Sequence, residues 1–324
     1  MRWLIAVILL AGCTGKQDKG VLEKAPFATI TDSIKKFPDD AGLLVRRAEL
    51  LSQHNLHELA NQDYAKAWQR DSSENLLMSY VSNLFLVNKP REAVRLLQSG
   101  VKRFPENADF RRRLSEAYLQ SGRNQDALAQ YDSILQQDST NFEAWYEKGL
   151  MLLEGNDTAA AINALARSYA LQPLSMNGLA LANLYAETKN PLALTIADDL
   201  LSKDDQPENI DPIFIKGIYY SNTGQHQQAR EQFDKIIRID YKFADAYIEK
   251  GIILFEEKNI DEALETFKMA ATVATTNPDA YYWQGRCYES VGKTEEAMDN
   301  YIRAYALDRQ FVEAKRGIDR LRKK

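Results

Sequence analysis

Residues 281–308, with the sequence YYWQGRCYESVGKTEEAMDNYIRAYALD, decide the fold of this chain. Small residues stand at Gly285 and Ala297, and an aromatic residue, Tyr301, follows the second of them after four positions. Spacings of three and four residues place side chains on one face of an α-helix. Gly292, between the two small residues, is typical of a turn. The stretch therefore predicts two short antiparallel helices that approach closely through their small residues.

The alanine of this stretch recurs through the chain with a period close to 34 residues. The spacings between successive copies are 33, 34, 34, 32, 36, 34 and 34 residues. In seven of the eight copies a large apolar or aromatic residue follows four positions later, and Ala197 is the exception. Self-similarity at a fixed period is the sequence signature of a repeat architecture. The eight alanines are Ala60, Ala93, Ala127, Ala161, Ala193, Ala229, Ala263 and Ala297.

A second small site lies twelve residues before the alanine in several copies, so each unit is expected to hold two helices. The residues at this site are Ala48, Gly149, Gly217, Gly251 and Gly285. Turn-forming residues stand between the two helices of four units. These residues are Gly122, Asn156, Gly224 and Gly292.

This pattern resembles the tetratricopeptide repeat family, whose unit is a 34-residue helix-turn-helix. The clearest copies are Trp145-x3-Gly149 with Ala161 and Pro173, and Tyr281-x3-Gly285-x2-Tyr288 with Ala297 and Tyr301. The resemblance implies an all-α fold, a right-handed superhelical solenoid of about eight helix hairpins. The eight units are expected at residues 41–74, 75–107, 108–141, 142–174, 175–209, 210–243, 244–277 and 278–311.

Both ends of the array are expected to carry a capping helix. A helix over residues 29–37, ended by Pro38, resembles the second half of a lost repeat, and residues 312–324 resemble a closing helix. Such caps cover the apolar face that a terminal repeat would otherwise expose.

The repeat pattern weakens in the fifth unit, where looser packing is expected around Ala197. The polar segment 202–211 contains Pro207, which would interrupt a helix. We therefore expect a joint there, dividing a tetratricopeptide segment over residues 29–209 from a second one over residues 210–324. An alternative is that the extra residues only lengthen a surface loop.

The N-terminus has the features of a secretion signal. Arg2 precedes the apolar run 4–11, which is about half as long as the roughly 20 residues that span a bilayer. Leu10-Ala11-Gly12-Cys13 resembles the lipobox of bacterial lipoproteins, in which the cysteine is acylated and becomes the new N-terminus. The alternative is a plain signal peptide with an incidental cysteine.

The lipobox resemblance implies a processed and lipid-anchored protein. Residues 1–12 would be the signal peptide, and residues 13–28 would be the lipidated Cys13 and a flexible tether. Acyl chains on Cys13 would hold the protein on a membrane surface without spanning it. The implied location is the bacterial cell envelope, and Thr14 after the cysteine favours the outer membrane, facing the periplasm.

Composition narrows the classes of function. Hydrophobic residues make up 45% and charged residues 27% of the chain, as in globular proteins, and the net charge of -5 argues against a nucleic-acid binder. Gly292-Lys293-Thr294 lacks the second glycine of a phosphate-binding loop, since Cys287 stands at its position. Cys287 is expected to be a buried, inert thiol. His54 and His57 have no cysteine beside them to complete a metal site.

No enzyme activity, cofactor or metal is therefore expected. The basic C-terminal end has two interpretations, and its residues are Lys315, Arg316, Arg320, Arg322, Lys323 and Lys324. Its charges either complement the end of a helix or contact an anionic lipid or polymer.

The family resemblance also implies a binding groove. Positions two, five, nine, twelve and thirteen of each unit would face it. These positions hold Glu49, Arg112, Glu116, Tyr146, Leu150, Leu153, Phe214, Ile218, Ile248, Ile252, Phe255, Tyr282 and Arg286. Aromatic and arginine side chains on an apolar wall are typical of a binding surface. The alternative is that some of them pack against adjacent helices.

The residues at positions five and nine indicate what the groove would bind. Family members that clamp a terminal carboxylate use Lys and Asn there, whereas this chain has Arg112 with Glu116 and Tyr282 with Arg286. We therefore expect an extended or helical segment of another envelope protein to bind through apolar pockets, and not through its C-terminus.

The predicted function is that of a non-enzymatic, membrane-anchored scaffold with a protein or peptide partner in the envelope. The alternative is an accessory subunit that binds peptidoglycan or another glycan, with Tyr146, Phe214 and Tyr282 as aromatic platforms.

Overall fold

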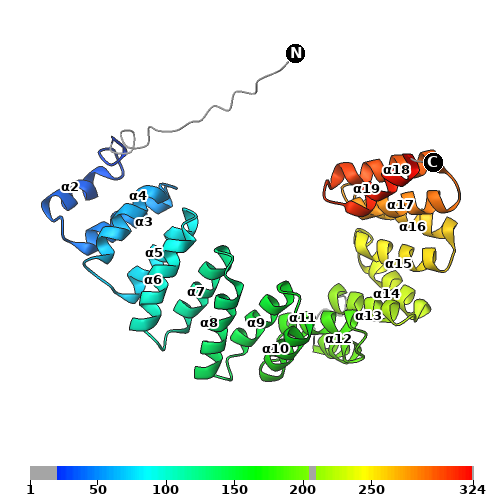
Figure 1. Cartoon of the computed structure of the whole chain (residues 1–324), viewed down its shortest axis with the longest axis horizontal. Helices are drawn as coiled ribbons and strands as arrows, with labels where there is room; N and C mark the ends of the chain where they lie inside the picture. Colours follow the sequence, from blue (N-terminus) through cyan, green and yellow to red (C-terminus); the bar gives the residue numbers. More distant parts are fainter. Residues whose placement is uncertain (1–19, 204–208, 323–324) are drawn as a thin grey trace, which may run out of the picture. The chain divides into compact units, whose positions relative to one another are not determined.

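A computed structural model describes residues 20–203 and 209–322 of the protein. Within these ranges all regular structure is helical and comprises the eighteen helices α2 to α19, which confirms the expected all-α fold of repeated helix pairs (Figure 1). Cys13 and the expected signal peptide, residues 1–12, lie outside the described residues.

The chain divides into two compact units, the first ending at Ala144 and the second beginning at Trp145. The helices that lie within the first unit are α2 (Ala28–Lys36), α3 (Ala41–Gln53), α4 (His57–Trp68), α5 (Glu74–Leu86), α6 (Pro90–Arg103), α7 (Ala108–Gln120) and α8 (Asn124–Gln137). The division falls within α9 (Phe142–Glu154).

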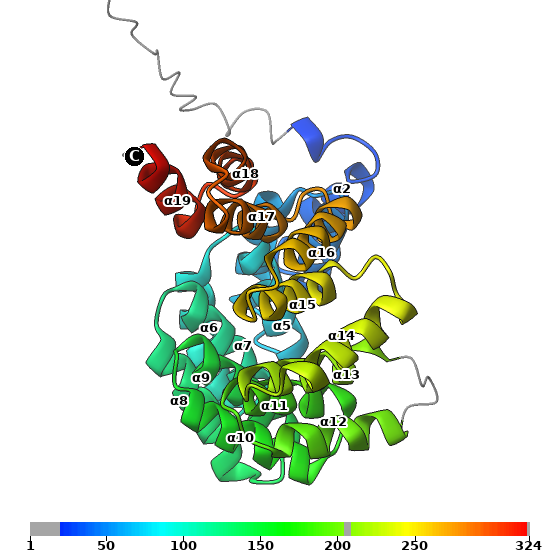
Figure 2. The same ribbon diagram turned by 90° about the vertical axis from the view of Figure 1, so that its right-hand side faces the viewer.

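The second unit continues the alternation of first and second helices (Figures 1 and 2). Its remaining helices are α10 (Thr158–Leu171), α11 (Ser175–Glu187), α12 (Leu192–Lys203), α13 (Ile210–Asn222), α14 (His226–Ile239), α15 (Ala244–Glu256), α16 (Ile260–Val273), α17 (Pro278–Ser290), α18 (Thr294–Leu307) and α19 (Val312–Arg322).

The helix bounds confirm the expected repeats. The first helices α3, α5, α7, α9, α11, α13, α15 and α17 begin within one residue of the eight predicted unit starts. The helices α2 and α19 lie where the two caps were expected. Each helix pair therefore matches one of the units of about 34 residues expected from the sequence.

Every turn between the two helices of a repeat contains one residue with a left-handed backbone, with φ between 53° and 77°. This conformation lets the chain reverse within three or four residues and favours glycine or asparagine. The four predicted turn residues Gly122, Asn156, Gly224 and Gly292 are confirmed. The other four, which the sequence analysis did not identify, are Asn55, Asn88, Lys189 and Lys258.

The eight periodic alanines are all fully buried, as predicted. They lie on the second helix of each repeat, and the close contact on the first helix is made by a glycine in four repeats. A Cβ atom added to Gly251 would lie 2.5 Å from Cε1 of Phe267, and one added to Gly285 would lie 2.7 Å from Cδ1 of Tyr301. The helices are thus as close as their backbones and these rings allow.

In the fifth repeat the small residue and the large residue of the helix contact exchange places. Leu181 of α11 stands where other repeats have glycine, and Ala197 of α12 stands where they have a large side chain. Both residues are buried, at 3% and 0% exposure. The looser packing expected around Ala197 remains a prediction.

The joint expected at residues 202–211 includes residues 204–208, which lie outside the described residues. On either side of them α12 packs against α13, and Leu201 packs on the core that contains Ile213. Both helices belong to the second compact unit. The joint and the segment boundary at residue 209 remain predictions.

A buried polar network attaches the capping helix α2 to the first repeat. Arg47 of α3 donates to both carboxylate oxygens of Asp63 on α4, at 2.7 and 2.8 Å. A third donor atom of the same guanidinium reaches the hydroxyl oxygen of Thr31 on α2, at 3.2 Å. All three residues are buried, so the polar network satisfies itself and ties the capping helix to the first repeat.

Candidate functional site

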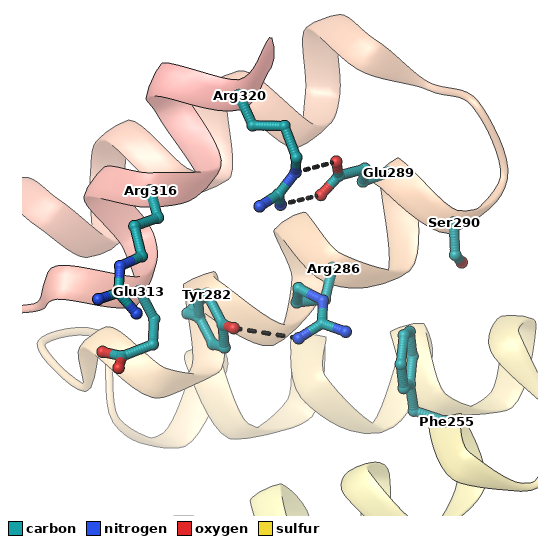
Figure 3. A pocket seen from close by; sticks show the side chains of 8 residues that line it. All are labelled: Phe255, Tyr282, Arg286, Glu289, Ser290, Glu313, Arg316 and Arg320. Atoms are coloured by element: carbon teal, nitrogen blue, oxygen red, sulfur yellow. Dashed lines mark hydrogen bonds and ion pairs between the residues drawn. The ribbon is translucent and has the colours of Figure 1, made fainter.

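A cavity in the second unit lies between the first helices α15 and α17 and the capping helix α19 (Figure 3). Its volume is about 500 Å³. The side chains that line it are Phe255, Tyr282, Arg286, Glu289, Ser290, Glu313, Arg316 and Arg320.

The aromatic side of the cavity is held firmly by neighbouring rings. The centroid of the Tyr282 ring lies 5.1 Å from that of Phe311 and 5.5 Å from that of Trp283. Trp283 in turn lies 5.6 Å from Phe255 and stacks on the fully buried Phe267, at 5.7 Å and an interplanar angle of 11°. Ring packing of this kind orders the wall before any ligand arrives.

Arg286 extends over this aromatic wall. Its guanidinium carbon lies 5.3 Å from the ring centroid of Phe255 and 5.4 Å from that of Trp283. One of its nitrogens donates a hydrogen bond of 3.1 Å to the hydroxyl of Tyr282. The cation–π contacts position the guanidinium without neutralising it. Arg286 makes no ion pair with any other residue in the described part of the chain.

Arg320 has a different environment, because Glu289 pairs with it. The two hydrogen bonds from Arg320 to the carboxylate measure 2.7 and 2.6 Å. The hydroxyl of Tyr301 also donates to Glu289, at 2.7 Å. The bonds to Glu289 raise the pKa of Arg320, while burial and then the bond to Glu289 raise the pKa of Tyr301. The charges of Glu289 and Arg320 are thus mutually satisfied.

Arg316 lies one helical turn before Arg320 on α19. Its side chain is exposed and forms no ion pair with the residues that the structure describes. In Figure 3 the ring of Tyr282 lies between Arg316 and Arg286. The cavity therefore presents two guanidinium groups that lack a carboxylate partner, with aromatic surface between them.

Of the predicted groove residues, this cavity brings together Phe255, Tyr282 and Arg286. Others are half-buried and contribute to cores between helices, as the alternative interpretation held. Phe214 packs its ring 5.7 Å from Phe233 and 5.6 Å from Phe243. The half-buried remainder comprises Tyr146, Leu150, Leu153, Ile218 and Ile252.

Ile248 differs from the expectation, because it is buried at 7% exposure in the core with Tyr247 and Ala280. Its position near the start of α15 faces the neighbouring helices closely enough to exclude water. This residue stabilises the contact between repeats and offers no surface to a partner.

Arg112, in the first unit, is already engaged. It donates to Glu143 at 2.6 Å and lies 3.5 Å from Asp109. Glu116 pairs with Arg113 at 3.0 Å, and Glu49 is exposed. These ion pairs join neighbouring repeats or turns of one helix, so Arg112 differs from Arg286 in having acidic partners within the chain.

The sequence analysis assigned Arg316 and Arg320 to the basic C-terminal end and not to the groove, although a signal for the groove was present. If the capping helix is counted as the first helix of a ninth unit beginning at residue 312, the two arginines occupy positions five and nine. These are the positions of Tyr282 and Arg286 in the preceding unit. The closing helix thus carries the groove positions of a repeat.

The other residues singled out for chemistry have structural surroundings. Cys287 is fully buried, and burial raises the pKa of its thiol to about 12, in agreement with the expected inert thiol. The Nδ1 atom of His54 lies 2.9 Å from the carbonyl oxygen of Leu50. Within the described ranges no three His, Cys, Asp or Glu side chains form a group that could hold a metal ion.

Acidic side chains also gather along helices α15 and α17. Burial, and then the charges of Asp245, Asp279 and Glu256, raise the pKa of Glu249 to about 7. Burial and Asp245 also raise the pKa of Asp279. The negative potential of this cluster makes the ionised form of Glu249 unfavourable.

No candidate membrane-spanning segment occurs among the described helices. None of them combines the length and the apolar character needed to cross a bilayer.

Several known proteins are similar to this chain in sequence. It is 23% identical to the peroxisomal targeting signal receptor of Saccharomyces cerevisiae over 90% of this chain and 45% of the receptor. It is 22% identical to human DnaJ homolog subfamily C member 7 over 76% of this chain and 47% of that protein. The chain thus spans about half the length of these relatives.

Solved structures show the same fold at low sequence identity. PilW, a type IV pilus biogenesis factor, superimposes with a TM-score of 0.53 and 15% identity, over 64% of this chain and 97% of that one. The C-terminal part of a repeat-containing protein from Cytophaga hutchinsonii gives a TM-score of 0.51 and 13% identity, over 74% and 98%. These similarities concern the fold alone.

Models of the tetratricopeptide repeat match residues 86–142, 118–176, 216–278 and 278–311, which together make up more than half of the chain. The matches coincide with helix pairs whose alanines are buried at the predicted spacing. This chain belongs to the tetratricopeptide repeat family.

Proposed function

We propose that the protein is a non-enzymatic adaptor whose second unit binds a peptide segment of another cell-envelope protein. The family fold is that of a protein–protein interaction scaffold. The observation that carries the proposal is the cavity between α15, α17 and α19, where Phe255, Tyr282 and Arg286 meet. Aromatic and arginine side chains are the residues that most often anchor a bound partner.

The dimensions of the cavity favour a peptide. A volume of about 500 Å³ accommodates a few side chains, and the cavity is open along the face formed by successive first helices. The rings are fixed by contacts with Trp283 and Phe311, so a partner would meet an ordered surface. An ordered surface lowers the entropy cost of binding.

A direct glycan-binding role has less support. The three rings proposed as platforms include Phe214, which packs between Phe233 and Phe243 in a core. A sugar ring needs an open aromatic face, which Phe214 does not supply.

The proposal includes a lipid anchor on Cys13, supported by the sequence Leu10-Ala11-Gly12-Cys13. We propose that the anchor holds the adaptor at the outer membrane, facing the periplasm. Metabolic labelling with a radioactive fatty acid should label the full chain, and Cys13→Ala should abolish the label and release the protein from membranes. Equal labelling of both forms would contradict acylation at Cys13.

Site-specific photo-crosslinking in intact cells tests the adaptor role. A benzophenone amino acid replaces Phe255 or Tyr282 in the cavity, or Met269, which is 48% exposed on the second helix α16, as a control. Irradiation should link the two cavity positions to one continuous segment of one protein, and the control position should not capture that segment. Identical products from all three positions would contradict the proposed site.

A further inference from the structure

We propose that the cavity between α15, α17 and α19 receives the side chain of a glutamate within the partner peptide. This inference rests on the proposed function and specifies the chemistry of the bound segment. The methylene groups of the glutamate would pack on the rings of Phe255 and Tyr282. Its carboxylate would accept hydrogen bonds from the guanidinium groups of Arg286 and Arg316.

The charges that line the cavity support an anionic ligand. Of its three arginines, Arg320 alone is neutralised, through two hydrogen bonds to Glu289. Arg286 bonds only to a neutral phenol hydroxyl among the described residues, and Arg316 has no ion pair there. Two guanidinium groups that form no ion pair with the described residues therefore line this cavity, although the chain as a whole has a net charge of -5.

The position of Arg286 strengthens the interaction that a carboxylate would make. Its guanidinium lies against Phe255, Trp283 and Tyr282 and is half-buried, so fewer water molecules solvate it than solvate an exposed arginine. A charge-assisted hydrogen bond to a positioned, partly desolvated guanidinium is stronger than one in open water. The rings also hold the group in place before binding.

The aromatic walls distinguish a glutamate side chain from a terminal carboxylate. A terminal carboxylate is attached directly to the peptide backbone and brings no apolar stem of its own. Glutamate carries two methylene groups between its backbone and its charge, which match the rings of Phe255 and Tyr282 beside the two arginines. The combination of ring surface and free guanidinium groups therefore favours glutamate.

Two carboxylates line the cavity, and Glu313, unlike Glu289, is not paired with Arg320, so its charge opposes an acidic ligand. It lies exposed near the start of α19, one turn before Arg316, and forms no ion pair within the described residues. Figure 3 shows its carboxylate at the same end of the cavity as Arg316. Its charge should weaken the binding of a glutamate, which provides a substitution expected to increase affinity.

The test begins with a library of twelve-residue peptides displayed on phage and fused through their C-termini, so that no displayed peptide has a free terminal carboxylate. Selection against the full chain should enrich glutamate at one position beside an apolar residue. The enriched peptide is then synthesised with an amidated C-terminus and with Glu, Asp or Gln at that position. Fluorescence anisotropy measures the binding of each to the full chain.

Replacing Glu by Gln in the peptide should weaken binding about tenfold or more, the usual effect of losing a hydrogen bond between charged groups. Asp should bind more weakly than Glu because its stem is shorter. Arg316→Gln and Arg286→Gln should each reduce the preference for Glu over Gln. Lys315→Gln is the matched control, since it removes the same charge from the neighbouring, exposed position of α19 outside the cavity lining.

Glu313→Gln should bind the Glu peptide several-fold more tightly, a gain that a folding defect cannot produce. Thermal melting verifies that each variant is folded. Equal binding of the Glu and Gln peptides at a site that Tyr282→Ala disrupts would overturn the glutamate inference and leave the adaptor function standing. Binding that requires a free C-terminus would also overturn the inference. Failure to select any peptide, or binding of purified peptidoglycan instead, would overturn both proposals.

Discussion

At the scale of single residues, two inter-helix turns place a lysine where the left-handed backbone favours glycine or asparagine. Each repeat needs one left-handed residue in its inter-helix turn, and Lys189 and Lys258 occupy that position in two repeats. A residue with a Cβ atom is strained there by roughly 1–2 kcal/mol, and asparagine tolerates the conformation better than lysine. These two lysines are therefore sites where the protein can be stabilised.

Lys258→Gly should raise the free energy of unfolding by about 0.5–1 kcal/mol, because relief of strain exceeds the entropy that glycine adds to the unfolded chain. Thermal or urea unfolding measures the change. Asn156→Gly, at the equivalent turn with φ of 61°, should give a smaller gain. Equal or lower stability of Lys258→Gly would contradict the strain argument.

Gly251 illustrates the opposite case, a glycine required by close packing inside a helix. Alanine in place of an interior helical glycine normally stabilises by about 0.5–1 kcal/mol. Here the added methyl would lie 2.5 Å from Phe267, which is fully buried and stacked on Trp283. Because this ring is fully buried, it can move only by displacing its neighbours.

Gly251→Ala should therefore destabilise the second unit by about 1–3 kcal/mol, as overpacking usually does. Gly155→Ala is the control, because the nearest atoms to its added methyl lie at an ordinary 3.4 Å. Calorimetry of both variants measures whether the free energy of unfolding rises or falls. A stabilised Gly251→Ala would mean that helix propensity dominates and that the assigned contact is loose.

At the scale of helices, the first helices α15 and α17 bring acidic groups together. Burial and neighbouring carboxylates raise the pKa of Glu249 to about 7 in the folded protein, from an ordinary value of 4.5. The folded state then binds a proton at a higher pH than the unfolded chain does. Stability from this group is thus fully present below about pH 4.5 and decreases as the pH rises through about 7.

Glu249→Gln should raise the free energy of unfolding at pH 8 by about 1–3 kcal/mol, and should flatten its dependence on pH between about 5 and 8. Urea unfolding at several pH values measures both effects. Glu231→Gln on α14 removes the same charge from an exposed position and should leave the pH dependence intact. An unchanged profile for Glu249→Gln would show that other groups carry the pH dependence.

At the scale of the whole molecule, helices α2 and α19 close the two ends of the repeat array. The ring of Tyr301 lies between Gly285 of α17 and Gly317 of α19, where an added Cβ on either glycine would come within 2.7 Å of it. Tyr301 is fully buried in this arrangement, and Ala304 and Ala314 are buried together with Tyr281. The closing helix therefore completes the last hydrophobic core.

Deletion of residues 312–324 should expose one face of Tyr301 and lower the stability of the second unit by roughly 1–1.5 kcal/mol for that side chain alone. Thermal melting and binding of a hydrophobic dye measure the effect, and deletion of residues 323–324 is the control. Unchanged melting of the longer deletion would show that α19 is not a structural cap. The deletion also removes Arg316, so it should abolish glutamate recognition.

Much of this architecture could be predicted from residue spacing. Helix packing depends on the side-chain volume at fixed positions of each repeat. A 34-residue period repeats those positions eight times, so a true pattern can be distinguished from a coincidence in one copy. The exchange of Leu181 and Ala197 could also have been found by comparing the two positions in every unit. The turns at Lys189 and Lys258 could not, because lysine carries no signal for a left-handed backbone.

The sequence by itself determined the helix pairs, their starts, the buried alanines and the family. Only the tertiary structure decided which arginines are available to a partner. Arg47 pairs with Asp63 across 16 residues, and Arg112 and Arg320 pair with carboxylates 31 residues away, while Arg286 and Arg316 have none among the described residues. Long charged side chains reach several neighbouring helices, so their pairing depends on three-dimensional distances that spacing along the chain does not specify.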